Sequence, residues 1–262
     1  MEPVTDPALS VSTPHGRYYA HPTRKASVPS ITNILNQKAK NGLPKWAARS
    51  AAEYAADNMD KLTILDRDER VSLIKQAPFG RSVAAEIGDV VHGWIDRYVK
   101  GDMPAQDEIA AAPLTARRMW VQFAGFVSKY HPEFVDSEFT CWSDTHGYAG
   151  TADLSFRLGE FLILCDTKTG NRVYPEVALQ TSAIKYADVV LGSDGAEAPV
   201  PKFDRLACLH LRPTYARLIP IQHDEHAFRA FLGLKAVFDF EVLHSDETLM
   251  YAPKIETPTG GA

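Results

Sequence analysis

The chain has 262 residues, of which 45% are hydrophobic and 10% aromatic, so it can bury a substantial core without division into several domains. Its net charge of −5 gives no general attraction to nucleic acid, and no apolar run approaches the roughly 20 residues that span a membrane. The first ten residues are polar and proline-bearing, so we expect no signal peptide and a soluble cytoplasmic protein.

Basic residues are concentrated near the N-terminus. The segment from Val11 to Ser50 contains seven Lys and Arg residues and no Asp or Glu. Such a block suits a polyanion, and it is also the pattern of an ordinary solvated surface. The three cysteines are isolated and two lie in apolar runs, which favours reduced cysteines in the core.

The first half of the chain is predicted to be mainly helical. Ser30 suits the N-cap of a short helix. Longer helices are expected at residues 45–59, 83–99 and 114–129. In the second of these, apolar residues recur every three or four positions and line one face.

Strand-like segments begin after Pro132. The expected strands cover residues 134–142, 150–157, 161–168, 205–212 and 216–222. A helix is expected from Pro175 to about Val190, a flexible loop from Gly192 to Pro201, and a last helix, capped by Asp224, to about Leu243. This order of elements predicts an α+β domain around a small sheet.

We expect one domain over residues 16–251. Its part up to residue 131 is mainly helical and its part from 132 contains the sheet. Residues 1–15 and 252–262 are expected to be flexible tails.

The segment Gly150–Lys168, GTADLSFRLGEFLILCDTK, predicts a hairpin that carries a metal site. A two-residue turn at Gly159-Glu160 places Asp153 opposite Asp166, with Lys168 on the same face. Carboxylates placed opposite each other repel unless a cation compensates them, and their oxygens suit Mg²⁺. The alternative is a surface ion pair between Asp166 and Lys168, with Asp153 ending a turn.

Five short motifs, in this order and spacing, resemble a known family. Gly150-Thr151-Ala152-Asp153, a hydrophobic strand and Asp166-Thr167-Lys168 look like the core of PD-(D/E)XK nucleases. More narrowly, they resemble the RecB-type branch, which includes phage exonucleases and CRISPR-adaptation nucleases. Gly88-Asp89-Val90-Val91-His92 resembles the branch's Gly-x-x-x-His motif, and Gln180 its glutamine motif. Val28-Pro29-Ser30-Ile31-Thr32 resembles the opening of phage members, so the resemblance covers most of the chain.

The resemblance implies a restriction-endonuclease-like fold, with a small mixed sheet flanked by helices and a helical N-terminal region. It implies phosphodiester hydrolysis by metal-activated water. The residues it makes catalytic are Asp153, Asp166, Lys168 and Gln180. The ligands it assigns to Mg²⁺ or Mn²⁺ are His92, Asp153, Asp166 and the carbonyl of Thr167. Glu138 resembles an acidic position of the branch, near the ligands or at a second metal, although a strand-end charge is the alternative.

Two departures from the family pattern affect what we expect. Ile184 occupies the position where the branch usually has a tyrosine. Three scattered cysteines cannot supply the four that hold an iron–sulfur cluster in the CRISPR-associated relatives, so we expect no cluster.

DNA contacts are predicted from charge and aromatic character. Loop aromatics can stack on unpaired bases, and basic side chains can follow a phosphate backbone. The positions predicted on this basis are Lys38, Lys40, Lys45, Arg49, Trp142, Tyr148, Arg172 and Lys185.

The predicted function is that of a metal-dependent DNA exonuclease in phage recombination or DNA processing. Its expected partners are single-stranded DNA or duplex ends and a strand-annealing or recombinase protein. One alternative is a structure- or end-specific endonuclease of the same fold. Another is an inactive nucleic-acid-binding protein, which the missing tyrosine favours. Polarity, strand preference and oligomeric state stay open.

Overall fold

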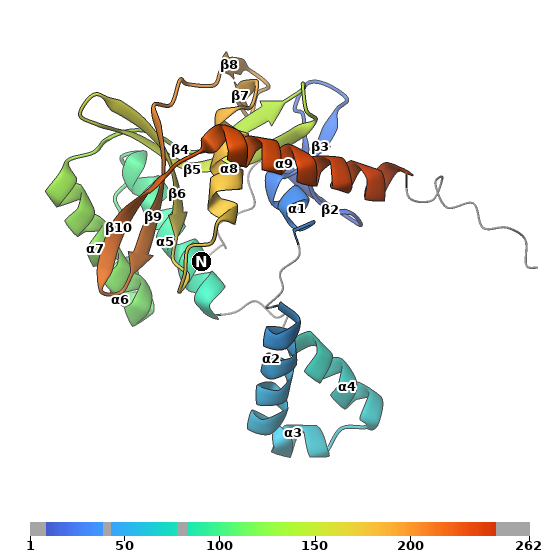
Figure 1. Cartoon of the computed structure of the whole chain (residues 1–262). Helices are drawn as coiled ribbons and strands as arrows, with labels where there is room; N and C mark the ends of the chain where they lie inside the picture. Colours follow the sequence, from blue (N-terminus) through green and yellow to red (C-terminus); the bar gives the residue numbers. More distant parts are fainter. Residues whose placement is uncertain (1–8, 39–42, 78–82, 245–262) are drawn as a thin grey trace, which may run out of the picture.

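A seven-stranded mixed sheet lies at the centre of the computed structural model, which describes residues 9–38, 43–77 and 83–244 (Figure 1). Its strands are β4 (Glu133–Ser143), β5 (Tyr148–Leu158), β6 (Phe161–Lys168), β7 (Val189–Leu191), β8 (Glu197–Pro199), β9 (Arg205–Arg212) and β10 (Tyr215–Ile221). Their order across the sheet is β10-β9-β6-β5-β4-β7-β8. The pair β6 and β9 is parallel, and the other neighbours are antiparallel.

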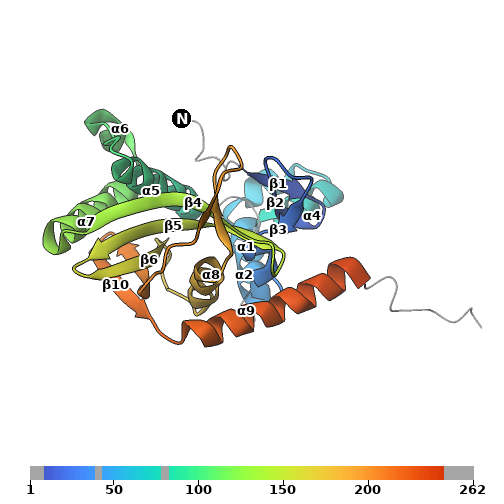
Figure 2. The same cartoon turned by 90° about the horizontal axis from the view of Figure 1, so that it is seen from above.

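Helices cover both faces of this sheet, which gives three layers (Figure 2). The helices on one face are α5 (Val83–Val99) and α7 (Leu114–Tyr130), with the short α6 (Gln106–Ala111) between them in the sequence. The helices on the other face are α1 (Ile31–Leu35), α8 (Glu176–Lys185) and α9 (Asp224–Asp239), which continues into a π-helical turn at Phe240–His244. This mixed sheet between helices agrees with the predicted α+β class.

The apolar stripe of α5 explains why this helix lies on the sheet. Val91, Trp94 and Ile95 are buried in a core cluster that also includes Phe123 of α7 and Leu154 of β5. Burial of each such side chain favours folding by roughly 1.5–3 kcal/mol. The orientation that buries this stripe also decides which side chains of α5 face β4 and β5.

A second sheet is formed by residues near the N-terminus. Its antiparallel strands are β1 (Ser10–Thr13), β2 (Gly16–Ala20) and β3 (Ser27–Pro29). A bridge between Ser30 and Ala149 connects it to β5. The expected tail at residues 1–15 is therefore wrong at residues 10–13, and the N-terminal part is less purely helical than predicted.

Three helices form a separate lobe between α1 and α5 in the sequence (Figure 1). They are α2 (Leu43–Asp57), α3 (Met59–Thr63) and α4 (Arg67–Gln76). Asp66 caps α4, accepting hydrogen bonds from the backbone N–H groups of Asp68 and Glu69. Among the described side chains of the lobe, Leu62 is the buried one, so the lobe has little core of its own.

Several predicted elements are confirmed at their bounds. The strands at residues 161–168 and 205–212 and the helix at 83–99 begin and end as expected. Ser30 caps α1, since its hydroxyl accepts a hydrogen bond from the backbone N–H of Asn33 at 3.0 Å. The three cysteines are free and buried, as predicted.

Two expectations after β6 are wrong. The helix expected to reach about Val190 ends at Lys185, because Val189–Leu191 pairs with β4 as β7. The expected flexible loop contains β8, which pairs with β7.

The predicted cap of the last helix is also wrong. Asp224 is the first residue of α9, and the N-cap is His223, with φ 60°. The Asp224 carboxylate instead accepts hydrogen bonds from Lys185 at 2.6 Å and from the Tyr186 hydroxyl at 3.1 Å. None of the described helices is long and apolar enough to cross a membrane.

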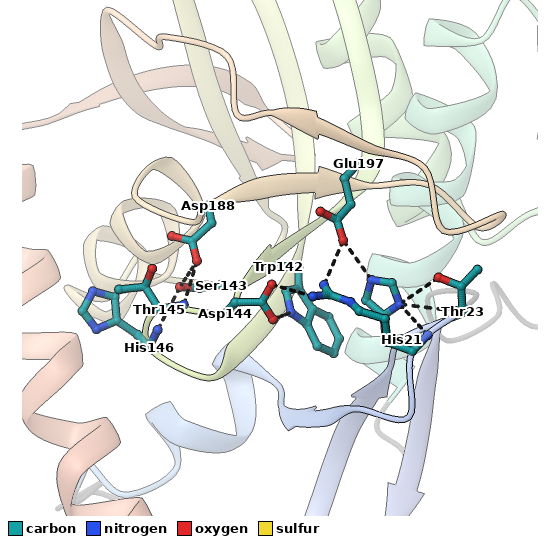
Figure 3. Close-up of polar contacts among 10 residues, drawn as sticks. His21, Thr23, Trp142, Ser143, Asp144, Thr145, His146, Asp188 and Glu197 are labelled. Carbon is teal, nitrogen blue, oxygen red and sulfur yellow. Dashed lines mark hydrogen bonds and ion pairs between the residues drawn. The ribbon is translucent and has the colours of Figure 1, made fainter.

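A buried histidine after β2 connects the small sheet to β8 (Figure 3). His21 Nδ1 accepts hydrogen bonds from the backbone N–H groups of Thr23 and Arg24, at 3.3 and 3.2 Å. The ring therefore carries its proton on Nε2, which lies 3.2 Å from Glu197 Oε1.

Arg24 extends this contact to the turn between β4 and β5. Its guanidinium lies 2.8 Å from Glu197 and 2.9 Å from Asp144. The other Asp144 oxygen accepts a hydrogen bond from Trp142 Nε1 at 2.8 Å. The His21 ring lies edge-on to that indole, 5.2 Å away. We call His21, Arg24, Asp144 and Glu197 the N-terminal clamp.

Candidate metal centre

Acidic residues stand in a row across three neighbouring strands. The β4–β5 pairs on either side of Glu138 place it opposite Asp153. The last β5–β6 pair joins Leu154 to Cys165, so the preceding Asp153 lies opposite Asp166. This is the register predicted from a turn at residues 159 and 160, and Gly159 has the positive φ of 58° that such a turn needs.

Two of these carboxylates, from Glu138 and Asp153, form the most compact group of potential metal ligands together with the imidazole of His92. One ligand atom each from His92, Glu138 and Asp153 lie within 4.8 Å of one another. His92 comes from the middle of α5, and its Nδ1 lies 3.7 Å from Asp153 Oδ2. Two carboxylates and an imidazole are ligands that Mn²⁺ or Mg²⁺ accepts. The residues present therefore fit a divalent cation.

Glu138 has an unusual backbone for a strand residue. Its φ is 51°, which is in the left-handed region, and β4 carries a register shift nearby, between Phe134 and Asp136. A non-glycine residue at such φ costs of order 1–3 kcal/mol, and such residues cluster at functional sites. The irregularity brings the Glu138 side chain into the group with His92.

The environment of Glu138 resists a negative charge. Burial, followed by the nearby Asp153 and Asp96, raises the pKa of Glu138 to about 8, against a smaller lowering effect of Lys100. In the absence of a cation, this carboxyl group holds its proton at neutral pH. A divalent cation would displace that proton and remove the repulsion.

Asp166 lies beside the compact group and outside it. It is 2% exposed, and burial and the charge of Asp153 raise its pKa. Lys168 Nζ lies 2.8 and 2.7 Å from its two oxygens. Only Oδ1 accepts a hydrogen bond with good geometry, so Oδ2 is a buried oxygen with unused acceptor capacity.

Lys168 is held in its charged form. Burial lowers the pKa of the ammonium, but the carboxylates of Asp166 and Asp153 outweigh burial and raise it. About a third of the side chain is exposed (35%). The ammonium therefore stands between a buried carboxylate and solvent.

The backbone of Thr167 joins β5 to β6 at this point. Its N–H donates a hydrogen bond to Asp153 Oδ2 at 2.8 Å, the same oxygen that faces His92. This bond orients Asp153. The ligand role predicted for the Thr167 carbonyl stays a prediction.

Gly88 lets α5 approach the segment after β6. A Cβ atom at this position would lie 2.9 Å from Thr169 Oγ1, too close for an unstrained contact. His92 follows one turn later in α5, so a side chain at position 88 would push it away from Asp153. Gly88 therefore permits a close approach between α5 and the segment after β6.

The segment after β6 is fixed by two residues of β9. His210 Nε2 lies 2.8 Å from the carbonyl oxygen of Gly170. Arg212 donates hydrogen bonds to the carbonyl oxygen of Thr169 and, at 2.6 Å, to Asn171 Oδ1. The chain beyond Lys168 is thus ordered by side-chain contacts as well as by the sheet.

No protein-family model matches the chain, and no curated protein is significantly similar to it in sequence. The functional assignment therefore depends on the residues of the site and their geometry.

Gln180 is not part of the contacts described above. It lies in α8, half-buried, and its amide makes no hydrogen bond within the described part of the chain. Its predicted catalytic role stays a prediction.

Two of the predicted DNA contacts are wrong. Trp142 and Tyr148 are 0% exposed, because β2 and the helices of the second face cover them. The Tyr148 hydroxyl donates a hydrogen bond to the carbonyl oxygen of Ala183 at 2.8 Å. Neither ring is available to stack on a base.

Three of the six predicted basic contacts have acidic partners. Lys38 lies 3.0 Å from Glu176, and Lys185 lies 2.6 Å from Asp224. Arg49 lies 2.7 Å from Glu53. Within the described residues, Lys45 and Arg172 are exposed and have no ion pair, and Lys40 lies outside those residues. A continuous basic track is therefore not apparent among them.

Sequence reasoning missed two further polar residues beside the site, Asp96 and Lys100. Asp96 Oδ1 accepts a hydrogen bond from the Ser137 hydroxyl at 2.7 Å and lies 2.7 Å from Lys100 Nζ. His92, Asp96 and Lys100 recur every four residues along α5 and the residue that follows it, so the three side chains share one face. That spacing was the signal that could have found them.

Proposed function

We propose that the chain is a metal-dependent DNA exonuclease with a restriction-endonuclease-like fold, as the resemblance to PD-(D/E)XK nucleases implies. The observation that carries the proposal is the acidic row of Glu138, Asp153 and Asp166 between His92 and Lys168. Three carboxylates at one level of a sheet repel one another, which is unusual for a structural ion pair. Such a cluster is expected where a cation is bound beside a phosphate.

The arrangement of the strands supports the same proposal. Strands β4, β5 and β6 are antiparallel neighbours, α8 follows them, and β9 returns parallel to β6. This is a mixed sheet of the kind that the resemblance implies. The site lies at the end of β6, where α5 and the segment after Lys168 come together.

The chemistry follows from the donor set. Mg²⁺ or Mn²⁺ held by His92, Glu138 and Asp153, with Asp166 adjoining, would lower the pKa of a bound water and balance charge that builds on the phosphate. Lys168 is charged and partly exposed, so its ammonium can hydrogen-bond a phosphate oxygen or the attacking water. Asp166 keeps that ammonium in place.

The position where the branch usually has a tyrosine lies in the core of this protein. Ile184 is 2% exposed and packs in the core cluster of α1, α8 and α9. An inactive nucleic-acid-binding protein is the alternative, and it would bind DNA in excess chelator and cut none with Mg²⁺ or Mn²⁺.

The test is a nuclease assay on 5′- and 3′-labelled linear DNA with Mg²⁺, Mn²⁺ or chelator. Asp153→Asn, Asp166→Asn and Lys168→Met should each abolish metal-dependent degradation. Glu160→Gln, an exposed acid in the same hairpin, should leave it unchanged. Full activity in the Asp153 or Asp166 variant, with an intact fold by thermal melting, would refute the proposal. Circular DNA separates the alternatives, since an exonuclease spares it and an endonuclease cuts it.

A further inference from the structure

A cavity of about 340 Å³ lies next to the acidic row, on the far side of β6 from Asp153. The loop before α8, the first turn of that helix and strands β9 and β10 surround it. The residues that define it are Tyr174, Pro175, Val177, Cys208, Ile219 and Ile221. This volume falls within the size range of small-molecule sites.

The sheet register places the cavity close to the acidic row. Cys208 pairs with Asp166 across β6 and β9 and with Ile219 across β9 and β10. Neighbouring strands are roughly 4.8 Å apart, so the cavity begins one strand away from the Asp166 carboxylate. A group held in the cavity and a phosphate beside Lys168 can therefore belong to one nucleotide.

The chemistry of the cavity fits a flat heterocycle. Its inner wall is apolar and includes the buried Cys208 and Val177. Tyr174 at its edge is 61% exposed, and the Gln222 amide, also exposed, offers a hydrogen-bond donor and acceptor. The lining contains no charged side chain, so it does not suit the phosphate itself.

We propose that this cavity holds the base of the nucleotide whose phosphate lies at the acidic row, with Tyr174 stacked on it. The inference rests on the proposed nuclease function and specifies which form of DNA the enzyme would degrade. A base in a duplex stack cannot enter the cavity, so the nucleotide at the site must be unpaired. The preferred substrate is therefore a single strand or a single-stranded end.

The test compares single-stranded oligonucleotides that carry one abasic residue at successive positions from the end. Hydrolysis by the wild-type chain in Mg²⁺ should fall about 10-fold when the abasic residue occupies the scissile nucleotide, because one stacked base is lost. Tyr174→Ala should lose about 10-fold on the normal strand and nothing further on that abasic strand. Ala178→Phe, which fills the cavity, should reproduce this loss.

Controls separate the possible outcomes. Tyr130→Ala removes another exposed tyrosine, on α7, and should behave as wild type on every strand. If the wild-type chain degrades DNA while the abasic scan is flat and Tyr174→Ala matches wild type, the cavity proposal is wrong and the nuclease proposal stands. If the wild-type chain degrades no DNA with either metal, the nuclease proposal fails and this inference fails with it.

Discussion

Replacement of Glu138 by glutamine should make the metal-free protein more stable at alkaline pH. The pKa of this carboxyl group is raised from 4.5 to about 8, by burial first and then by Asp153 and Asp96. Its folded form therefore binds a proton more tightly than its unfolded form. Stability from this group is present below about pH 4.5 and is lost as the pH rises toward 8.

The size of the effect follows from the same values. Each pH unit between 4.5 and about 8 removes up to about 1.4 kcal/mol from the free energy of unfolding, or roughly 5 kcal/mol in total. Glutamine has the shape of the protonated acid and cannot ionise. The Glu138→Gln variant should thus match wild type near pH 4.5 in chelator and exceed it by several kcal/mol near pH 9.

Urea unfolding across this pH range, in chelator, measures the difference. Mg²⁺ should then reverse the ranking at alkaline pH, because wild type gains stability by binding the cation and the variant gains less. Glu160→Gln, at the exposed turn of the β5–β6 hairpin, is the matched control and should follow wild type. Identical pH profiles for wild type and Glu138→Gln in chelator would show that Glu138 does not lie in the repulsive environment described here.

Three other predictions follow from the site. Gly88→Ala should stabilise the fold less than Gly125→Ala in α7 does in the same denaturant titration, because the Cβ at position 88 would displace the Thr169 hydroxyl whereas the space at position 125 is open. Lys168→Met should reduce nuclease activity at least about 100-fold. The same variant should lower the free energy of unfolding by about 3 kcal/mol at about pH 8, and by less at acid pH, where Asp166 takes up a proton. Mn²⁺ or Mg²⁺ should raise the melting temperature of the wild-type chain and chelator should reverse this, whereas a calorimetric scan without any shift would contradict a cation site.

The hairpin of β5 and β6 shows which features local sequence can predict. Its register depends on a two-residue turn and on alternation within two short segments, and Leu154 indeed pairs with Cys165. The stripe of α5 is equally local, because its period is that of the helix itself. Both were predictable without knowledge of distant residues.

Features that depend on distant contacts were not predictable. Glu138 joins the site through an irregular backbone at φ 51°, and nothing in its neighbours marks that conformation. Residues 189–191 form a strand because β4 offers an edge to pair with. Trp142 is buried against Tyr19 and His21, which are more than a hundred residues earlier in the chain, so its loop-like surroundings suggested an exposed ring.

The N-terminal clamp sets a limit on how far this protein can be shortened. A fragment that starts at Ile31 would contain the whole large sheet and the helices on both of its faces, yet it would lack His21 and Arg24. Asp144 and Glu197 would then repel each other without their shared guanidinium, and the indole of Trp142 would meet water. Such a truncation should aggregate, so the segment that carries the small sheet, His21 and Arg24 is needed to keep the rest of the chain in solution.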